Sequence, residues 1–238
     1  MKISSGIPAI SKLVEQQLRN WELARIQRPG PAASERPEVE DFVCVSRQVG
    51  VDGERVAAVL GRELGWPVFG REILDAMAGD DPTRMRIYTS LDERDLTWWE
   101  EAVRAVLDRG FIRNDYFRRL SETVLSLARK GTSVFVGRGA DLILPRHLGF
   151  RVRLAESREK RLARFAAAYG LEPAVADRRL DEVERKRGEF LKNHFGVEAA
   201  DPLRYDLIVN LDRWTIEDAA ALALEARSLR RGSRSART

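Results

Sequence analysis

The chain has 238 residues, 44% of them hydrophobic and 33% charged, which suits one large α/β domain or a domain with an appendage. Its 41 basic and 37 acidic residues give a formal net charge of +4, an excess too mild to favour nucleic-acid binding. Cys44 is the only cysteine, so an intrachain disulfide is excluded. No apolar run approaches membrane-spanning length or resembles a signal peptide, and we therefore expect a cytoplasmic protein.

Residues 1–40 are predicted to form an N-terminal helix, over about 8–27, and a linker that carries Pro29, Pro31 and Pro37. We expect this segment to lie outside the main domain, which runs from 41 to 230. The helix could pack back, act as a cap or pair with a second copy of the chain. We favour the last alternative, which would give a homodimer.

The main domain begins with an apolar run at residues 42–45 that predicts a buried strand. A polar loop with Gly50 and Gly53 follows, and the spacing of Val56, Leu60 and Leu64 then predicts a helix. A strand, a glycine loop and a helix together favour binding of a phosphate by backbone N–H groups. The alternative is an ordinary turn of an α/β domain.

Helices and strands alternate along the rest of the domain. Apolar alternation and runs predict strands near 66–69, at 133–136, 150–154 and 205–211. Helical spacing predicts helices over 71–78, 91–107, 115–130, 156–169, 173–195 and 215–230, and we expect the basic tail over 231–238 to be disordered. This order predicts a parallel sheet of about five strands with helices on both faces. The segment over about 70–130 would be a helical insertion near the ligand-binding end of the sheet.

Three groups of arginines would meet in one crevice of such a fold: Arg47, Arg138 and the basic cluster at 185–187. Arginine binds phosphate oxygens bidentately, which suits phosphoryl transfer. The cluster at 185–187 could instead be a solvated face, and Arg158 and Arg161 are better explained by surface ion pairs. His147 and His194 are too isolated to indicate a metal site or a catalytic base, and Trp98 and Trp99 fit a core stripe better than an acceptor pocket.

With these segments assembled, the chain resembles the cytidylate-kinase-like family of P-loop nucleoside monophosphate kinases. The matching segments are 45–54, 136–141, 151–161, 184–187 with Phe190, 201–202 and 205–210. The resemblance implies a P-loop NTPase-like three-layer fold with a helical insertion and a lid over about 173–196. It also implies ATP as donor, Mg²⁺, and CMP or dCMP as acceptor.

The resemblance assigns roles to particular residues. The phosphate loop would contain Ser46, Arg47, Gly50, Asp52 and Gly53. Arg138 and Asp141 would bind the acceptor, although Gly139 and Ala140 separate them here. Arg185 and Arg187 would be the catalytic lid arginines.

The phosphate loop departs from the complete motif G-x-x-x-x-G-K-[ST]. If position 53 is the lysine position, Gly53 replaces the lysine and Glu54 replaces the hydroxyl residue, while the motif glycines fall on Arg47 and Asp52. Magnesium would then need another ligand, such as Ser46, Glu54 or water. The alternative to a kinase is a catalytically weak nucleotide-binding sensor or interaction module. The chain also departs from the kinase-like relatives after the second short strand. They usually have an aspartate at this position, and this chain has Gly70.

Overall fold

The structure is a computed structural model, and it describes residues 7–26, 39–88, 101–104 and 115–235. The sequence-predicted helix over 91–107, with Trp98 and Trp99, lies largely outside these residues, as does most of the proline-rich linker. The chain divides into two compact units, one of residues 1–44 and 61–149, the other of residues 45–60 and 150–238. We call them unit 1 and unit 2 and describe each by itself.

The five described strands form a single parallel sheet in the order β2-β3-β1-β4-β5, with helices around it, as the sequence predicted. Parallel neighbours need crossover connections, and helices supply them. The strands are β1 (Phe42–Arg47), β2 (Val68–Phe69), β3 (Ser133–Val136), β4 (Phe150–Ala155) and β5 (Leu207–Asn210). In register, Val68 lies opposite Val134, and Val152 lies opposite Leu207.

Helix α2 (Gly53–Leu64) follows β1 after a short loop. Val56, Ala57 and Leu60 are completely buried, which confirms the apolar face that their spacing predicted. Asp52 caps this helix, because its carboxylate accepts a hydrogen bond from the backbone N–H of Arg55 at 3.3 Å. The strand, loop and helix around residues 42–64 therefore fold as predicted.

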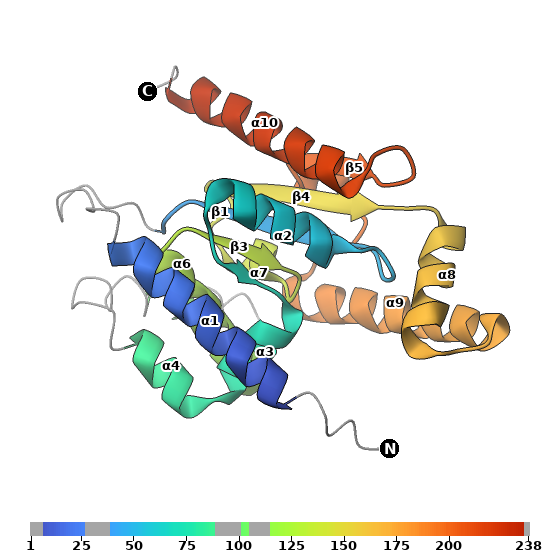
Figure 1. The fold of residues 1–238 in the computed structure, drawn as a ribbon, viewed down its shortest axis with the longest axis horizontal. Coiled ribbons are helices and arrows are strands. Elements are labelled where there is room, and N and C mark those ends of the chain that lie inside the picture. The colour runs from blue at the N-terminus through green and yellow to red at the C-terminus, as the bar shows by residue number, and fades with distance from the viewer. Residues whose placement is uncertain (1–6, 27–38, 89–100, 105–114, 236–238) are drawn as a thin grey trace. The chain divides into compact units, whose positions relative to one another are not determined.

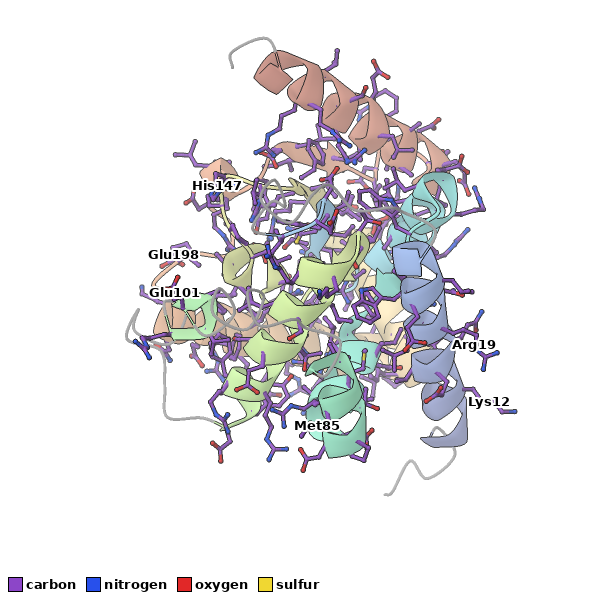
Figure 2. All side chains as sticks on the ribbon, turned by 90° about the vertical axis from the view of Figure 1, so that its left-hand side faces the viewer. Lys12, Arg19, Met85, Glu101, His147 and Glu198 are labelled. Carbon is purple, nitrogen blue, oxygen red and sulfur yellow. The ribbon has the colours of Figure 1, made fainter. Side chains whose placement is uncertain are left out.

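Most of α2 belongs to unit 2, and Figure 1 labels the helices that lie entirely within unit 1. They are α1 (Ile7–Ile26), α3 (Arg71–Gly79), α4 (Asp81–Tyr88), α6 (Asp115–Lys130) and α7 (Ala140–Ile143). Helix α1 packs beside α3, which differs from the expectation that it lies outside the main domain. Trp21 is buried, and its indole N–H donates to the carbonyl of Leu127 at 3.0 Å. Lys12 and Arg19 are exposed on the outer side of the same helix (Figure 2).

Unit 2 contains α8 (Arg158–Tyr169), α9 (Pro173–Phe195), the 3₁₀ turn η1 (Pro202–Arg204) and α10 (Ile216–Ser235). Figure 1 shows α8 and α9 side by side, and Phe165, Ala176 and Leu180 form the buried cluster between them. Helix α10 continues to Ser235, so residues 231–235 are helical and do not belong to the predicted tail. Gly232 lowers helix stability by only about 1 kcal/mol, which a helix can tolerate.

None of the described helices is long and apolar enough to cross a membrane.

Candidate functional site: a glycine loop and two arginine clusters

The loop between β1 and α2 is closed by backbone hydrogen bonds. The N–H of Gln48 donates to the carbonyl of Leu154 at 3.2 Å, and the N–H of Val51 donates back to the carbonyl of Gln48 at 3.3 Å. Gly50 has a φ of +85°, in the left-handed region that favours glycine. Its position also excludes a side chain, because an added Cβ would lie 2.7 Å from the carbonyl oxygen of Arg161.

Two arginines of α8 bind the carbonyls of this loop. Arg161 Nη1 donates to the carbonyl of Val49 at 3.1 Å, and Arg164 Nη1 donates to the carbonyl of Gly50 at 2.7 Å. The side chain of Val49 also packs against the apolar cluster of α8 and α9. The loop is therefore fixed from its α8 side. The sequence pattern favoured a surface ion pair for Arg161, but Arg161 is buried.

This attachment orients the N–H groups of the loop. In a trans peptide the N–H points opposite to the preceding carbonyl, so the N–H of Gly50 points away from the guanidinium that binds the Val49 carbonyl. Within the part of the chain that the structure describes, the N–H groups of Val49 and Gly50 donate to no acceptor. Free backbone N–H groups near a helix N-terminus favour binding of an anion.

Carboxylates balance the charge of the two arginines. Arg164 forms an ion pair with Glu156, whose side chain is only 4% exposed, with Arg164 Nη2 at 3.0 Å from Glu156 Oε1. This hydrogen bond raises the pKa of Arg164. Arg161 is paired with Glu184 of α9. Because both guanidinia are already neutralised, they hold the loop rather than act as open anion sites.

Arg47 ends β1 and lies beside the first turn of α2. Its Nη2 forms an ion pair with Glu54 Oε1 at 2.9 Å, and its side chain is 15% exposed. Its backbone carbonyl accepts a hydrogen bond from Arg187 Nη1 at 3.0 Å. The structure thus brings the predicted loop arginine and one predicted lid arginine into direct contact.

The remaining candidates of unit 2 differ in their surroundings. Ser46 Oγ lies 3.4 Å from Tyr205 Oη and 3.4 Å from Arg153 Nη1. Arg185 is exposed and pairs with Glu189, one turn further along α9, at 2.7 Å. The predicted solvated face therefore describes Arg185 better than it describes Arg187.

In unit 1, Arg138 follows β3 in a strained backbone. Gly137, Arg138 and Gly139 have φ values of +70°, +54° and +71°, and a positive φ is uncommon for a residue with a side chain. Strain of this kind is found most often at functional positions. Among the described residues, the Nε of Arg138 is buried and has no hydrogen-bond partner.

The carboxylate that binds Arg138 comes from α3. Arg138 forms an ion pair with Asp75, and its guanidinium carbon lies 5.9 Å from the ring centre of Tyr116. The hydroxyl of Tyr116 donates a hydrogen bond to the carboxylate of Asp75. Burial and this hydrogen bond raise the pKa of Tyr116, so its hydroxyl stays protonated. Sequence reasoning missed Asp75, since an acid within an amphipathic helix gives no signal of a partner 63 positions away. Asp141, the predicted acid, is buried in α7.

The described residues contain no group of three histidine, cysteine or acidic side chains that could hold a metal ion. His147 is exposed (Figure 2). The protein oxygens proposed for Mg²⁺ at the loop already face cations, because Glu54 pairs with Arg47 and Ser46 lies beside Arg153. These residues do not form a magnesium site by themselves.

Comparisons with known proteins identify a matching family and a solved structure of similar fold. The model of the cytidylate kinase-like family matches residues 42–213. An uncharacterized protein from Eubacterium ventriosum ATCC 27560 has a similar structure, with a TM-score of 0.63, 19% identity, and coverage of 79% of this chain and 98% of that protein. This likeness shows the fold.

Two further solved structures are more distant. A gluconokinase from Sinorhizobium meliloti 1021 has a TM-score of 0.47, 14% identity, and coverage of 84% of this chain and 98% of that one. A shikimate kinase from Bacteroides thetaiotaomicron has a TM-score of 0.40, 17% identity, and coverage of 78% and 96%. No curated protein matches the chain.

Proposed function

Because the chain belongs to the cytidylate kinase-like family, we propose that it transfers a phosphoryl group from ATP to a nucleoside monophosphate, with CMP or dCMP as the acceptor. The observation that carries this proposal is the orientation of the glycine loop. Its carbonyls are bound by Arg161 and Arg164, and the N–H groups of Val49 and Gly50 are left for an anion.

In this proposal the loop from Ser46 to Gly53 binds the polyphosphate of ATP. Its N–H groups and the N-terminus of α2 favour negative charge, and the capping carboxylate of Asp52 fixes where the helix begins. Arg187 and Arg185 of α9 are the proposed lid arginines. They would stabilise the charge on the transferred phosphoryl group. Arg187 already binds the loop backbone at Arg47.

Arg138 is the proposed ligand of the acceptor phosphate. Its strained backbone and its buried, unbonded Nε support a role in binding rather than in packing. Asp75 and Tyr116 hold its guanidinium in place. Asp141 remains the proposed acidic partner of the acceptor.

Magnesium would enter as part of the substrate, the ATP–Mg²⁺ complex. Mg²⁺ commonly takes most of its ligands from phosphates and water, with one or two from protein. This agrees with a loop whose own oxygens face cations.

The test is ADP formation from ATP–Mg²⁺ with CMP, dCMP, UMP, AMP and GMP offered separately. Formation of ADP together with the matching nucleoside diphosphate would support the kinase and name its acceptor. The control is Arg62, an exposed arginine that pairs with its neighbour Glu63; Arg62→Ala should behave as the wild type. Absence of ATP binding would leave the loop as an ordinary turn.

A second candidate function is a nucleotide sensor or interaction module. It is favoured by one observation, the presence of Gly53 and Glu54 where a complete phosphate loop has a lysine and a hydroxyl residue. ATP binding that no acceptor converts to turnover would favour the sensor over the kinase.

A further inference from the structure

Compared with the complete phosphate-loop motif, a cation and a glycine stand in exchanged positions in this loop. With position 53 as the lysine position, the complete motif has its first glycine at 47 and its lysine at 53. This chain has Arg47 and Gly53 instead. The motif's cation is missing from its usual position, and a different cation stands where a glycine is usual.

The structure brings positions 47 and 53 into direct contact. A Cβ added to Gly53 would lie 2.4 Å from Cδ and 3.2 Å from Nε of Arg47. The side chain of Arg47 thus passes directly over the α-carbon of Gly53 and fills the space where a side chain at 53 would begin. Even a methyl group at 53 would displace it.

Arg47 is held in this position at both ends. Glu54 pairs with its guanidinium at 2.9 Å, and Arg187 binds its backbone carbonyl at 3.0 Å. The side chain of Arg47 is 15% exposed, whereas that of Glu54 is 51% exposed. A polyphosphate arriving at the loop could therefore replace the more exposed carboxylate as the partner of the guanidinium.

We infer that Arg47 supplies the phosphate-binding charge that a lysine at position 53 supplies in a complete P-loop, and that Gly53 is needed to admit it. The inference rests on the proposed function, since it concerns how ATP binds. Arginine is suited to this role because its guanidinium stays charged and can bind two phosphate oxygens at once. Glu54 orients the guanidinium before ATP binds.

The experiment measures ATP affinity by isothermal titration calorimetry, with and without Mg²⁺, and uses inorganic triphosphate as a second probe. Arg47→Ala should weaken binding of both probes by about 10- to 100-fold, the range for a charged hydrogen bond. Arg47→Lys should retain part of the affinity. Arg62→Ala is the control, and the thermal midpoint of each variant shows whether it folds.

The exchange of places is tested at Gly53. Gly53→Ala should weaken ATP binding when Arg47 is present but cause no further loss in the Arg47→Ala background. This non-additivity is expected when two positions share one space. The double variant with Arg47→Ala and Gly53→Lys should regain affinity relative to Arg47→Ala, because the lysine then has room and supplies the missing charge.

The outcomes separate this inference from the proposed function. Failure of the wild type to bind ATP would refute the proposed function itself. Wild-type binding that survives Arg47→Ala unchanged would overturn only the role of Arg47. Additive losses at 47 and 53, or no recovery in the lysine-bearing double variant, would overturn the exchange of places.

Discussion

The guanidinium of Arg138 is paired with the carboxylate of Asp75, which lies on α3, 63 positions earlier in the chain. The pair joins a residue of strained backbone to a helix, and Tyr116 completes it through its hydrogen bond to Asp75. Arg138 is thus fixed by two side chains before any substrate arrives. Such fixed positioning is what a binding group for an acceptor phosphate requires.

Arg138→Ala should abolish acceptor-dependent ADP formation while ATP affinity stays nearly unchanged, because the substitution removes the proposed ligand of the acceptor phosphate. Steady-state kinetics with CMP and calorimetry with ATP measure the two effects separately. Equal loss of both, or of neither, would count against the assigned role.

Asp75→Asn should raise the KM for the acceptor without changing ATP affinity, since Arg138 loses the charge that orients it. A charged hydrogen bond contributes about 1.5–3 kcal/mol, so an increase of about 10- to 100-fold is expected. Asp81→Asn is the matched control, because Asp81 is an exposed acid on the neighbouring helix α4 that pairs with Arg84 and Arg119. An unchanged KM in Asp75→Asn would show that Arg138 needs no such partner.

Gly50→Ala should destabilise the protein by about 1–3 kcal/mol, because alanine is strained at φ +85° and its Cβ would collide with the Arg161 carbonyl. Gly188→Ala is the contrasting variant. Gly188 lies within α9, and a Cβ added there would have no atom within 4 Å. Gly188→Ala should therefore stabilise the protein by about 0.5–1 kcal/mol. Opposite shifts of the thermal midpoint are expected, and a stabilising Gly50→Ala would contradict the described loop.

Trp21→Ala should lower the free energy of unfolding by about 3–5 kcal/mol, as expected for removal of a buried aromatic side chain. Trp21→Phe retains most of the apolar surface but loses the hydrogen bond to Leu127, so part of that loss should remain. Urea denaturation measures both. Leu23→Ala on the same helix is the control, since Leu23 is 49% exposed and its substitution should change stability by no more than about 0.5 kcal/mol. If Trp21→Ala is as stable as this control, the packing of α1 does not contribute to stability, and α1 is an appendage as first expected.

The Asp181 carboxylate should titrate below its ordinary value of 3.8, because the hydrogen bond from Arg158 lowers its pKa. A lowered pKa in the folded state means that the stabilisation is present above pH 3.8 and is lost as the pH falls through the folded-state value. Carboxyl ¹³C NMR measures the midpoint. In the Arg158→Ala variant, the titration midpoint of Asp181 should return towards 3.8. A midpoint at or above 3.8 in the wild type would disprove the pairing of Arg158 on α8 with Asp181 on α9.

The sequence predicted the sheet and most helices because they depend on local patterns. The apolar runs at 42–45 and 133–136 and the spacing of Val56 and Leu60 each correspond to an element of the structure. The predicted end of the last helix, at about residue 230, was wrong. Helix α10 continues to Ser235, because a single glycine at 232 does not by itself end a helix.

The side-chain partners could not be predicted in the same way. Arg161 was interpreted as a surface residue because Glu156 and Glu159 are near it in sequence, yet it binds the Val49 carbonyl 112 positions away. The contact of Arg47 with Gly53 depends on how a strand end and a helix start are placed in space. Such contacts depend on the tertiary structure and leave no periodicity in the sequence.

If Arg138 binds the acceptor as proposed, its positive φ makes stability and activity favour different residues at this position. Glycine adopts a φ of +54° without strain, and asparagine does so more easily than arginine. If the codon for Arg138 is randomised and the library is selected only for folded protein, glycine and asparagine should be enriched. Selection of the same library for acceptor-dependent turnover should enrich arginine, and the difference between the two enrichments would measure how much stability the molecule gives up for its chemistry at that position.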